Sequence, residues 1–574
     1  MNIRSIFGLF WLTVGFPMLL SAQSVPFNQQ PDWESQPLGH YSTGLGIADI
    51  NGDGWEDLIV ANGNDMARQR LVVYYNQGDG SFPLTPDWQS SDVDYLGHLS
   101  VGDINGDNRP DVAVSVFLGP AGFSEPGLVK VYFNTGTELQ SLPGFKTADR
   151  MYTFSCALGD ADGDGDLDLA VAAGEPYNNV KDNGRIYFNQ NGVLDSLPGW
   201  KTQQKLGAMD VGFADFDGNG QLDIAFASHL TANTIYLADS SGNIANIAAW
   251  HSADPSYYAN SLCVGFVGPD SLPDLLISDN SQLGGAGKFK GYFFTGSVPP
   301  QSQPDWTSLD GGMGSSVWLE DVNGDSYPDF IGGRWWGAVK VYPGTASGIS
   351  SASVWQSATA SVCEAFAMKD LDRDGVTVHT VGLRPSLPGS SCLRISARPV
   401  EKILSLTKNG VPLTAGQDFV LNPEGYWVSF KADLQTGDSL IVEYELSADR
   451  DLVLTNWGPS EGNYIFYNQT QLVGLPQTEP LVQAYSLRAF PNPFNGSVQI
   501  EIRLATPQDL VVDIYNSLGQ RVRRLWNRPQ KSAGIRLSWN ATDDAGNPLP
   551  SGIYFVTAKT AVGKTYSSKI ILAK

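Results

Sequence analysis

Acidic, glycine-containing segments alternate with short apolar runs along most of the chain. The first such segment covers residues 49–57 (DINGDGWED) and leads directly into the apolar residues 58–61 (LIVA). Related segments begin at residues 103, 160, 215 and 321, and a decayed copy covers residues 266–274. The interval between successive copies is about 55 residues, which marks an internal repeat. Short runs rich in branched and aromatic residues, bounded by turn residues, predict β-strands.

Aromatic residues recur at the same interval as the acidic segments. One aromatic residue opens each repeat unit, and a short strand that contains aromatic residues closes it. The opening residues are Trp33, Trp88, Phe145, Trp200, Trp250, Trp306 and Trp355, and the closing strands cover residues 73–76, 131–134, 186–189, 235–237, 291–293, 339–342 and 465–468. Each of the seven units has room for about four strands. An all-β, seven-bladed β-propeller over residues 23–473 is therefore predicted. A solenoid shares the period, but aromatic-rich units of this length favour a closed ring.

The seventh unit is interrupted. Its acidic segment opens at residues 370–374 (DLDRD), loses the pattern after Gly375 and resumes at residues 449–451 (DRD). We infer that residues 376–448 are an insertion that forms a small β-subdomain, since alternating apolar residues follow a turn at residues 408–410 (KNG). The alternative is a degenerate seventh blade, but an insertion restores the missing pair of strands.

The acidic segments have the composition of a cation-binding loop. Oxygen-bearing side chains occupy positions one, three, five and nine, position seven offers a main-chain carbonyl, and glycine at position four allows a tight turn. Carboxylates gathered at one point repel one another unless a divalent cation lies between them, and this oxygen set suits Ca²⁺ better than Mg²⁺. The predicted ligands are Asp49, Asn51, Asp53, Trp55, Asp57, Asp103, Asn105, Asp107, Arg109, Asp111, Asp160, Asp162, Asp164, Asp166, Asp168, Asp215, Asp217, Asn219, Gln221, Asp223, Asp321, Asn323, Asp325, Tyr327, Asp329, Asp370, Asp372, Asp374 and Asp451.

An EF-hand is the main competing interpretation of these segments. It requires a glutamate at position twelve and helices on both sides, whereas position twelve here is an apolar strand residue such as Val60 or Phe226. β-flanked calcium loops therefore fit better. The net charge of −24 is then mostly the charge of the loops, and it disfavours binding to nucleic acid or to an anionic membrane surface.

The N-terminus has the pattern of a signal peptide over residues 1–22. Arg4 precedes an apolar stretch at residues 6–20, which glycine and proline interrupt, and the small residue Ala22 precedes the expected cleavage. A transmembrane anchor is the alternative, but the stretch is short for the roughly 20 residues that span a bilayer. We expect a mature chain without a transmembrane segment. Four cysteines without a CxxC pair fit an exported protein, and a bridge between Cys363 and Cys392 is left open.

In the acidic loops the chain resembles the FG-GAP (VCBS-type) repeat of integrin α-subunit propellers. The shared phrase is D-x-[DN]-G-D-x-x-x-D followed by an apolar strand, and the resemblance covers about 440 residues. It implies a seven-bladed propeller with structural Ca²⁺ in the blade loops. The fifth copy has Phe266 and Gly268 where acids belong, so we expect no ion there. In the seventh copy the insertion divides the ligands.

The C-terminus forms a separate unit. Residues 474–486 predict a linker, and residues 487–574 predict a small Ig-like β-sandwich. The segments 489–495 (AFPNPFN) and 551–555 (SGIYF) resemble the C-terminal sorting domain of type IX secretion substrates, which is similar to FlgD-type Ig-like domains. The resemblance implies Sec export, transfer by the type IX secretion machinery, and a place in the medium or at the cell surface. An ordinary Ig-like module is the alternative.

Candidate catalytic residues are scattered. No GxSxG, HExxH, P-loop or Rossmann motif stands in a fitting context. His40 and His98 precede the first two loops and either face the rim of the ring or occupy a strand position set by the repeat. Trp335 and Trp336 break the small-residue pattern of their strand, and they either stack on sugar rings or pack between blades.

Two classes of function fit these observations. We predict a secreted or surface-bound recognition or adhesion module, without catalysis, for a glycan or a protein. The alternative is a secreted polysaccharide lyase, which needs a cluster of lysine or arginine near a tyrosine or histidine base. The sequence has no concentrated basic cluster outside the C-terminal unit, around residues 521–524. That absence favours binding.

Overall fold

The computed structural model describes residues 25–253, 258–268, 272–294, 302–470, 485–490, 494–504, 509–516, 520–529, 534–560 and 565–573. The chain divides into two compact units, Met1–Thr470 and Gln471–Lys574. Every regular element among the described residues is a β-strand, which confirms the all-β class. No helix in these ranges is long and apolar enough to cross a membrane. The predicted signal peptide and residues 474–484 of the predicted linker lie outside the described residues.

The described part of the first unit contains seven four-stranded antiparallel sheets, or blades. From the inner to the outer strand, blade one is β2 (Ser42–Ala48), β3 (Asp57–Asn62), β4 (Val72–Tyr74) and β5 (Trp88–Gln89), and blade two is β6 (Tyr95–Gly102), β7 (Asp111–Gly119), β8 (Gly122–Tyr132) and β9 (Phe145–Lys146). Blade three is β10 (Cys156–Gly159), β11 (Asp168–Val171), β14 (Arg185–Tyr187) and β15 (Trp200–Lys201), and blade four is β16 (Ala208–Ala214), β17 (Asp223–Ser228), β18 (Thr234–Tyr236) and β19 (Trp250–His251).

The remaining blades follow the same order. Blade five is β20 (Ala259–Gly265), β21 (Asp274–Asp279), β22 (Phe289–Tyr292) and β23 (Trp306–Thr307), and blade six is β24 (Met313–Glu320), β25 (Asp329–Trp335), β26 (Lys340–Tyr342) and β29 (Trp355–Gln356). Blade seven is β30 (Cys363–Lys369), β38 (Asp451–Asn456), β39 (Tyr464–Phe466) and β1 (Trp33–Glu34). Two short hairpins, β12 (Gly174–Glu175) with β13 (Val180–Lys181) and β27 (Gly344–Thr345) with β28 (Gly348–Ile349), extend blades three and six.

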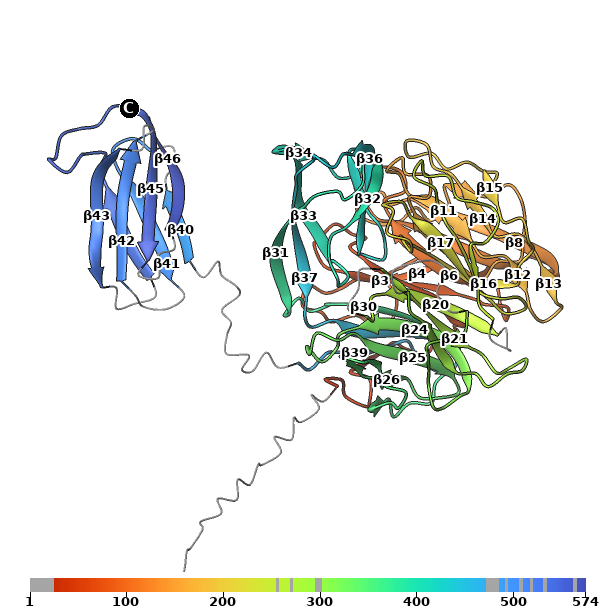
Figure 1. Ribbon diagram of the computed structural model, residues 1–574. Helices are drawn as coiled ribbons and strands as arrows, with labels where there is room; N and C mark the ends of the chain where they lie inside the picture. Colours follow the sequence, from red (N-terminus) through yellow and green to blue (C-terminus); the bar gives the residue numbers. More distant parts are fainter. Residues whose placement is uncertain are drawn as a thin grey trace, which may run out of the picture. The chain divides into compact units, whose positions relative to one another are not determined.

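The blades follow one another around a ring (Figure 1). Each inner strand contacts the inner strand of the next blade, and β30 contacts β2. The N-terminal strand β1 is the outer strand of the last blade, with Trp33 opposite Ile465 of β39. Side chains add bonds between blades: Asn134 Nδ2 donates to the carbonyl oxygen of Ile50 in the preceding loop, at 3.1 Å. Pairing the first strand with the last blade joins the two ends of the repeat array.

The aromatic residue that opens each sequence unit lies in the outer strand of the preceding blade and not in the blade that the rest of its unit forms. Trp250 is in the outer strand of blade four, yet it packs edge-to-face against Tyr292 of blade five, at 5.0 Å between ring centroids. Trp33 of blade seven packs in the same way against Tyr74 of blade one, at 5.8 Å. Each unit therefore begins with the outer strand of the preceding blade, and its aromatic ring covers the interface to its own blade.

Residues 376–447 form a two-sheet subdomain between β30 and β38. One sheet contains β31 (Val376–Leu383), β37 (Leu440–Ser447), β33 (Lys402–Lys408) and β34 (Val411–Leu413), and the other contains β32 (Ser390–Arg394), β36 (Trp427–Leu434) and β35 (Phe419–Leu421). Phe419, Phe430 and Leu440 belong to its buried core. The subdomain leaves the propeller at the seventh acidic loop and returns to it at the same place, because β31 and β37 pair along their full length.

The second unit is a β-sandwich. One sheet contains β40 (Tyr485–Phe490), β41 (Val498–Leu504) and β44 (Gly534–Trp539), and the other contains β43 (Arg521–Pro529), β42 (Asp509–Asn516), β45 (Gly552–Thr560) and β46 (Thr565–Leu572). Trp539, Val512 and Ile570 are buried between the sheets. Alternating inward-facing residues on two antiparallel sheets are typical of Ig-like sandwiches.

The four cysteines are free thiols, so the bridge between Cys363 and Cys392 is not formed. Cys363 is buried in blade seven, and Cys392 is buried in the inserted subdomain. Burial raises the pKa of Cys156 to about 12, which leaves this thiol protonated and unreactive at neutral pH. These cysteines act as small hydrophobic residues.

Candidate functional site

Each acidic loop lies between the inner strand and the second strand of its blade. In blade one, Asp49 Oδ1 accepts the N–H of Gly52 (2.7 Å) and Asp49 Oδ2 accepts that of Gly54 (2.9 Å). Asn51 Oδ1 accepts the N–H of Asp53 (2.8 Å). Gly52 and Gly54 have φ angles of +77° and +92°, which residues with side chains rarely adopt. The glycines therefore let the loop wrap around the carboxylate at position one.

The aspartate at position nine joins its loop to another strand of the same blade. Asp57 Oδ2 accepts the N–H of Ile50 (2.9 Å), and Asp57 Oδ1 accepts that of Asn76 just beyond β4 (3.0 Å). The same pair of bonds recurs at Asp111, Asp168, Asp223, Asp274, Asp329 and Asp451. Asp274 belongs to the decayed loop of blade five. Position nine therefore has a structural role that does not depend on a cation.

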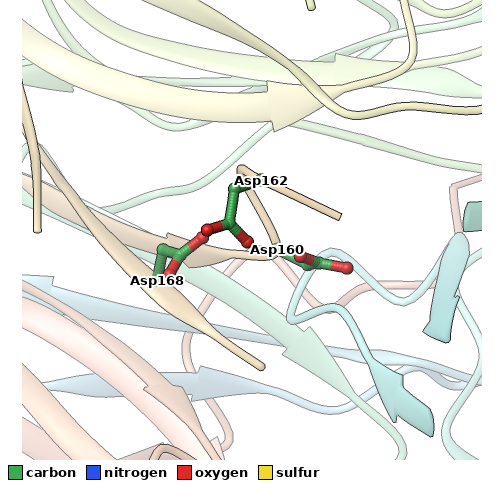
Figure 2. Close-up of side chains that lie close together, drawn as sticks. All are labelled: Asp160, Asp162 and Asp168. Carbon is green, nitrogen blue, oxygen red and sulfur yellow. The ribbon is translucent and has the colours of Figure 1, made fainter. Parts of the chain in front are cut away.

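Three loops bring three carboxylates within reach of one cation. The groups are Asp160, Asp162 and Asp168 in blade three, Asp215, Asp217 and Asp223 in blade four, and Asp370, Asp372 and Asp374 in blade seven; in each group, one oxygen per residue lies within 4.8 Å of the others. Figure 2 shows the carboxylates of Asp162 and Asp168 turned toward each other, with Asp160 beside them. Where the chain is described, blades one, two and six form no such group, since Asn51, Asn105 and Asn323 stand at position three.

Burial and mutual repulsion raise the pKa values of these carboxyls. The pKa of Asp160 rises to about 8 through burial and the charges of Asp164 and Asp162. Burial and the charge of Asp162 raise the pKa of Asp164 to about 6, and burial raises that of Asp215 to about 7. A divalent cation would offset the repulsion between the ionised groups. A donor set made of oxygen atoms fits a hard cation such as Ca²⁺.

The seventh loop gains a fourth carboxylate from beyond the insertion. Asp449 stands at position seven and is 2% exposed. Burial, with the charges of Asp374, Asp370 and Asp372, raises its pKa to about 8. The Oδ1 atoms of Asp449 and Asp370 are both buried without a hydrogen-bond partner, which a bound cation would supply.

Asp451 is predicted from the sequence as a ligand of the seventh loop, whereas Asp449 is not among the predicted ligands. The signal that could have found it is its position two residues before Asp451, where loop three also carries an aspartate, Asp166. The insertion separates Asp449 from Asp374 along the chain, yet the pairing of β31 with β37 brings the two ends of the loop back together.

Basic side chains neutralise parts of three loops. Arg109, predicted to offer its carbonyl, pairs its guanidinium with Asp107 in the same loop. Two residues of the inserted subdomain reach other loops: Lys431 Nζ lies 2.7 Å from Asp166 Oδ1, and Arg398 Nη1 lies 3.9 Å from Asp321 Oδ2. The carboxylates of loops two, three and six are thus shared between a potential cation and fixed positive charges.

The inserted subdomain covers the propeller face that carries the acidic loops. The N–H of Ser391 donates to the carbonyl oxygen of Gly220 in loop four (3.0 Å), and Asn422 Oδ1 accepts the N–H of Asp160 in loop three (3.3 Å). At loop five, Phe266 packs against Trp427, with 5.9 Å between ring centroids. An aromatic residue at position one, unable to bind a cation, thus serves as an apolar contact for the subdomain.

The subdomain also closes one end of the central channel. A cavity of about 330 Å³ is lined by the inner strands of all seven blades and by residues 399–400 and 423–426 of the subdomain. His98 lines this cavity, and burial lowers its pKa. It therefore occupies an inner-strand position set by the repeat and does not face the rim.

A second cavity lies at the opposite face, among the connections that follow the second strands. The second strands start at the acidic loops, and those of six or seven residues, such as β3 and β25, run about 20 Å to this face. The cavity measures about 220 Å³ and is lined by Trp335, Trp336, Trp457, Tyr177 and Asp65, among others. We call it the tryptophan pocket. Trp336 is 58% exposed, so it is not buried between blades.

Seven sheets in a ring, with acidic loops between their first and second strands, define a β-propeller with potential cation sites in its blades. The FG-GAP-like repeat family matches residues 49–114 and 160–226, and the FlgD Ig-like domain family matches residues 491–564. The chain therefore carries FG-GAP-like repeats and a C-terminal FlgD Ig-like domain, which confirms the resemblance to the FG-GAP repeat and to FlgD-type Ig-like domains.

Relatives match short stretches of the chain. Integrin alpha-3 of Mus musculus is 31% identical over 118 residues, which are 19% of this chain and 11% of the relative. Phosphatidylinositol-glycan-specific phospholipase D of Homo sapiens is 27% identical over 108 residues, 17% of this chain and 13% of the relative. The chain thus spans little more than a tenth of the length of these relatives.

Two solved structures show weaker likeness. PorZ, a surface component of the type-IX secretion system of Porphyromonas gingivalis, is 12% identical with a TM-score of 0.30, over 92% of this chain and 65% of that chain. BBS1N in complex with ARL6DN is 12% identical with a TM-score of 0.39, over 60% of this chain and 90% of that chain. These scores are too low to transfer a function.

Proposed function

We propose that this protein is a calcium-binding β-propeller that acts outside the cell as a recognition or adhesion module, without catalysis, for a glycan or a protein. The observation that supports recognition is the tryptophan pocket, which presents an exposed indole on the face that the inserted subdomain leaves open. None of the described residues that line it is lysine or arginine. A lyase for acidic glycans needs such residues beside its base, so the pocket favours binding.

Calcium has a structural role in this proposal. Asp160, Asp162 and Asp168 would hold one ion, the equivalent residues of blade four another, and Asp370, Asp372, Asp374 and Asp449 a third. The loops of blades one, two and six would use their asparagine and main-chain oxygens as well. Bound Ca²⁺ supplies positive charge among buried carboxylates. It thereby stabilises the loops on which the inserted subdomain rests.

The proposed location is the medium or the cell surface. The supporting features are the predicted signal peptide at residues 1–22 and the FlgD Ig-like domain at residues 491–564. In this proposal the second unit is a sorting domain for type IX secretion, following export by the Sec route. Deletion of residues 487–574 should then leave the protein in the periplasm of a type IX-competent host, whereas an ordinary Ig-like module would be dispensable for release.

The recognition proposal is tested by incubating the calcium-loaded protein with neutral and acidic polysaccharides and with cell-surface proteins. Gel retardation measures binding, and ultraviolet absorbance measures the unsaturated uronate ends that a lyase makes. We expect retardation without absorbance, loss of retardation in Trp336→Ala, and retention in Phe555→Ala, which removes an exposed aromatic ring from the second unit. Rising absorbance would establish the lyase instead. If no polysaccharide or protein gave either gel retardation or a rise in absorbance, the recognition proposal would be contradicted.

A further inference from the structure

Three indole rings in mutual contact line the tryptophan pocket. Trp335 and Trp457 are nearly parallel, at 17° and 6.3 Å between ring centroids. Trp336 is nearly perpendicular to both, at 77° and 6.3 Å from Trp335 and at 88° and 6.2 Å from Trp457. With such spacings, a single atom can lie within about 6 Å of all three centroids, the range of a cation–π contact.

The backbone holds Trp336 in an unusual conformation. Its φ angle is +51°, and of the non-glycine residues with positive φ in the described part of the chain it is the only aromatic one. Bulky residues avoid this region because of steric strain, which persists where the surrounding structure over-determines it and is concentrated at ligand sites. The result here is an indole ring that stands 58% exposed beside two partly buried ones.

The ionisable groups around the pocket are acidic, apart from one neutral histidine. Asp65 lines the pocket, and Glu364 lies behind Trp335 and accepts its Nε1–H. Glu364 Oε1 is fully buried and has no hydrogen-bond partner. His229 is the one described histidine in the lining; burial lowers its pKa to about 4, so it is neutral at physiological pH. The described lining thus offers acidic and aromatic groups but no positive charge.

The size of the pocket limits the ligand to a small group. Cavities for drug-sized ligands measure about 300 Å³ or more, and this one measures about 220 Å³. A neutral sugar ring would use the exposed face of Trp336, but it would leave the three-ring arrangement and the carboxylate of Asp65 unused. An alkylated ammonium group uses both, since it is attracted to indole faces and to carboxylates.

We propose that the tryptophan pocket binds a trimethylammonium group. The inference rests on the proposed recognition function and names the group that is recognised. Trp335, Trp336 and Trp457 provide the aromatic walls, Asp65 provides the negative charge, and Glu364 holds Trp335 through its hydrogen bond. The rest of the partner would extend from the pocket across the open face.

The test titrates the purified whole protein, in calcium, with small probes followed by calorimetry and tryptophan fluorescence. The probes are choline and its uncharged isostere 3,3-dimethylbutanol, phosphocholine, a trimethyllysine peptide with its unmethylated form, and methyl glycosides of common sugars. We expect choline to bind at least tenfold more tightly than dimethylbutanol. Whichever of phosphocholine and the trimethyllysine peptide binds more tightly identifies the source of the group.

Variants separate the contribution of the rings from that of the charge. Trp336→Ala should weaken choline binding at least tenfold, Trp336→Phe should weaken it less, and Asp65→Asn should weaken choline but not dimethylbutanol. Phe555→Ala, which removes an exposed aromatic ring from the second unit, is the matched control and should leave choline binding unchanged. An unchanged melting temperature in each variant shows that the fold is intact.

The outcomes also separate this inference from the proposed function. Equal binding of choline and dimethylbutanol, or choline binding that survives in Trp336→Ala, overturns the assignment of the ligand. Binding of a methyl glycoside that depends on Trp336, without choline binding, overturns it too but leaves the recognition function standing. If no probe binds while a polysaccharide or protein is still retarded in gels, recognition takes place at another surface.

Discussion

The aspartate at position nine can be tested in a blade that lacks the rest of the cation site. Asp274 in blade five is buried, and its two oxygens accept the N–H groups of Val267 (2.7 Å) and Phe294 (2.9 Å). The loop before it carries Phe266 at position one, so no cation is expected there. Asp274→Asn keeps one acceptor oxygen and turns an NH₂ group toward the second N–H. The matched change in a blade with a full carboxylate group is Asp168→Asn.

The two variants should differ in their dependence on calcium. Losing one charge-assisted hydrogen bond and leaving a buried N–H unpartnered costs about 2–3 kcal/mol. Asp168 accepts the same two kinds of hydrogen bond, from the N–H groups of Ala161 and Asn189, both at 2.7 Å. Asp168→Asn therefore lowers the free energy of unfolding by the same amount. A cation present at 100 times its Kd adds about 2.7 kcal/mol of stability, which this variant would also lose. We therefore expect Asp168→Asn to cost about twice as much as Asp274→Asn in calcium, and about the same in chelator.

The assay is urea unfolding followed by tryptophan fluorescence, with calcium or with chelator. Of the 15 tryptophans, only Trp526 and Trp539 lie in the second unit, so the signal reports mainly on the first. Asp433→Asn, at an exposed position of the inserted subdomain, is the control and should not change the midpoint. An Asp274→Asn cost that appears only in calcium, or an Asp168→Asn cost that calcium does not alter, would refute the separation of the two roles.

Three further predictions concern the loops and the pocket. Chelation should lower the melting temperature of the parent protein, and Asp162→Ala should lower it in part; no shift in either experiment would contradict cation binding in the loops. Asp449→Ala leaves Asp370, Asp372 and Asp374 in place, so it should weaken the calcium affinity of one site in a chelator-competition titration, whereas unchanged affinities at every site would exclude Asp449 as a ligand. Burial raises the pKa of Glu364 from 4.5 to about 8, so the folded state keeps a proton that the unfolded state has released between these values. Stability should therefore fall as the pH rises from about 5 to 8, and Glu364→Gln should flatten this slope; an equal slope in the variant would show that another group is responsible.

The repeat made the loops and strands predictable, because each loop encodes its own geometry locally. Glycine at position four and aspartates at positions one and nine specify a tight turn whose hydrogen bonds lie within a few residues, as in residues 49–57. The assignment of strands to blades was harder. Trp33 opens the first sequence unit but lies in the last blade, since strand pairing across the closed ring is a tertiary property that a local pattern does not contain.

The functional surfaces depend on tertiary contacts that cannot be predicted from the sequence pattern. Asp449 reaches the seventh loop only because the insertion returns to its starting point. Phe266 breaks the acidic pattern, and only the packed subdomain shows why an aromatic residue is useful there. Trp336 could be recognised in the sequence because it breaks the small-residue pattern of its strand. Whether its side chain packs or faces solvent depends on the backbone angle at that residue.

The two faces of the propeller therefore have separate tasks. The inserted subdomain covers the acidic face through contacts with loops three to six, and it closes that end of the channel. The tryptophan pocket lies at the other ends of the second strands, about 20 Å away, which is beyond the Debye length of about 8 Å at physiological ionic strength. Calcium in the loops would thus affect the pocket through the stability of the blades and not through its charge. At a temperature where the calcium-free protein remains folded, removing calcium should leave choline affinity unchanged, while warming should abolish binding first in the calcium-free sample.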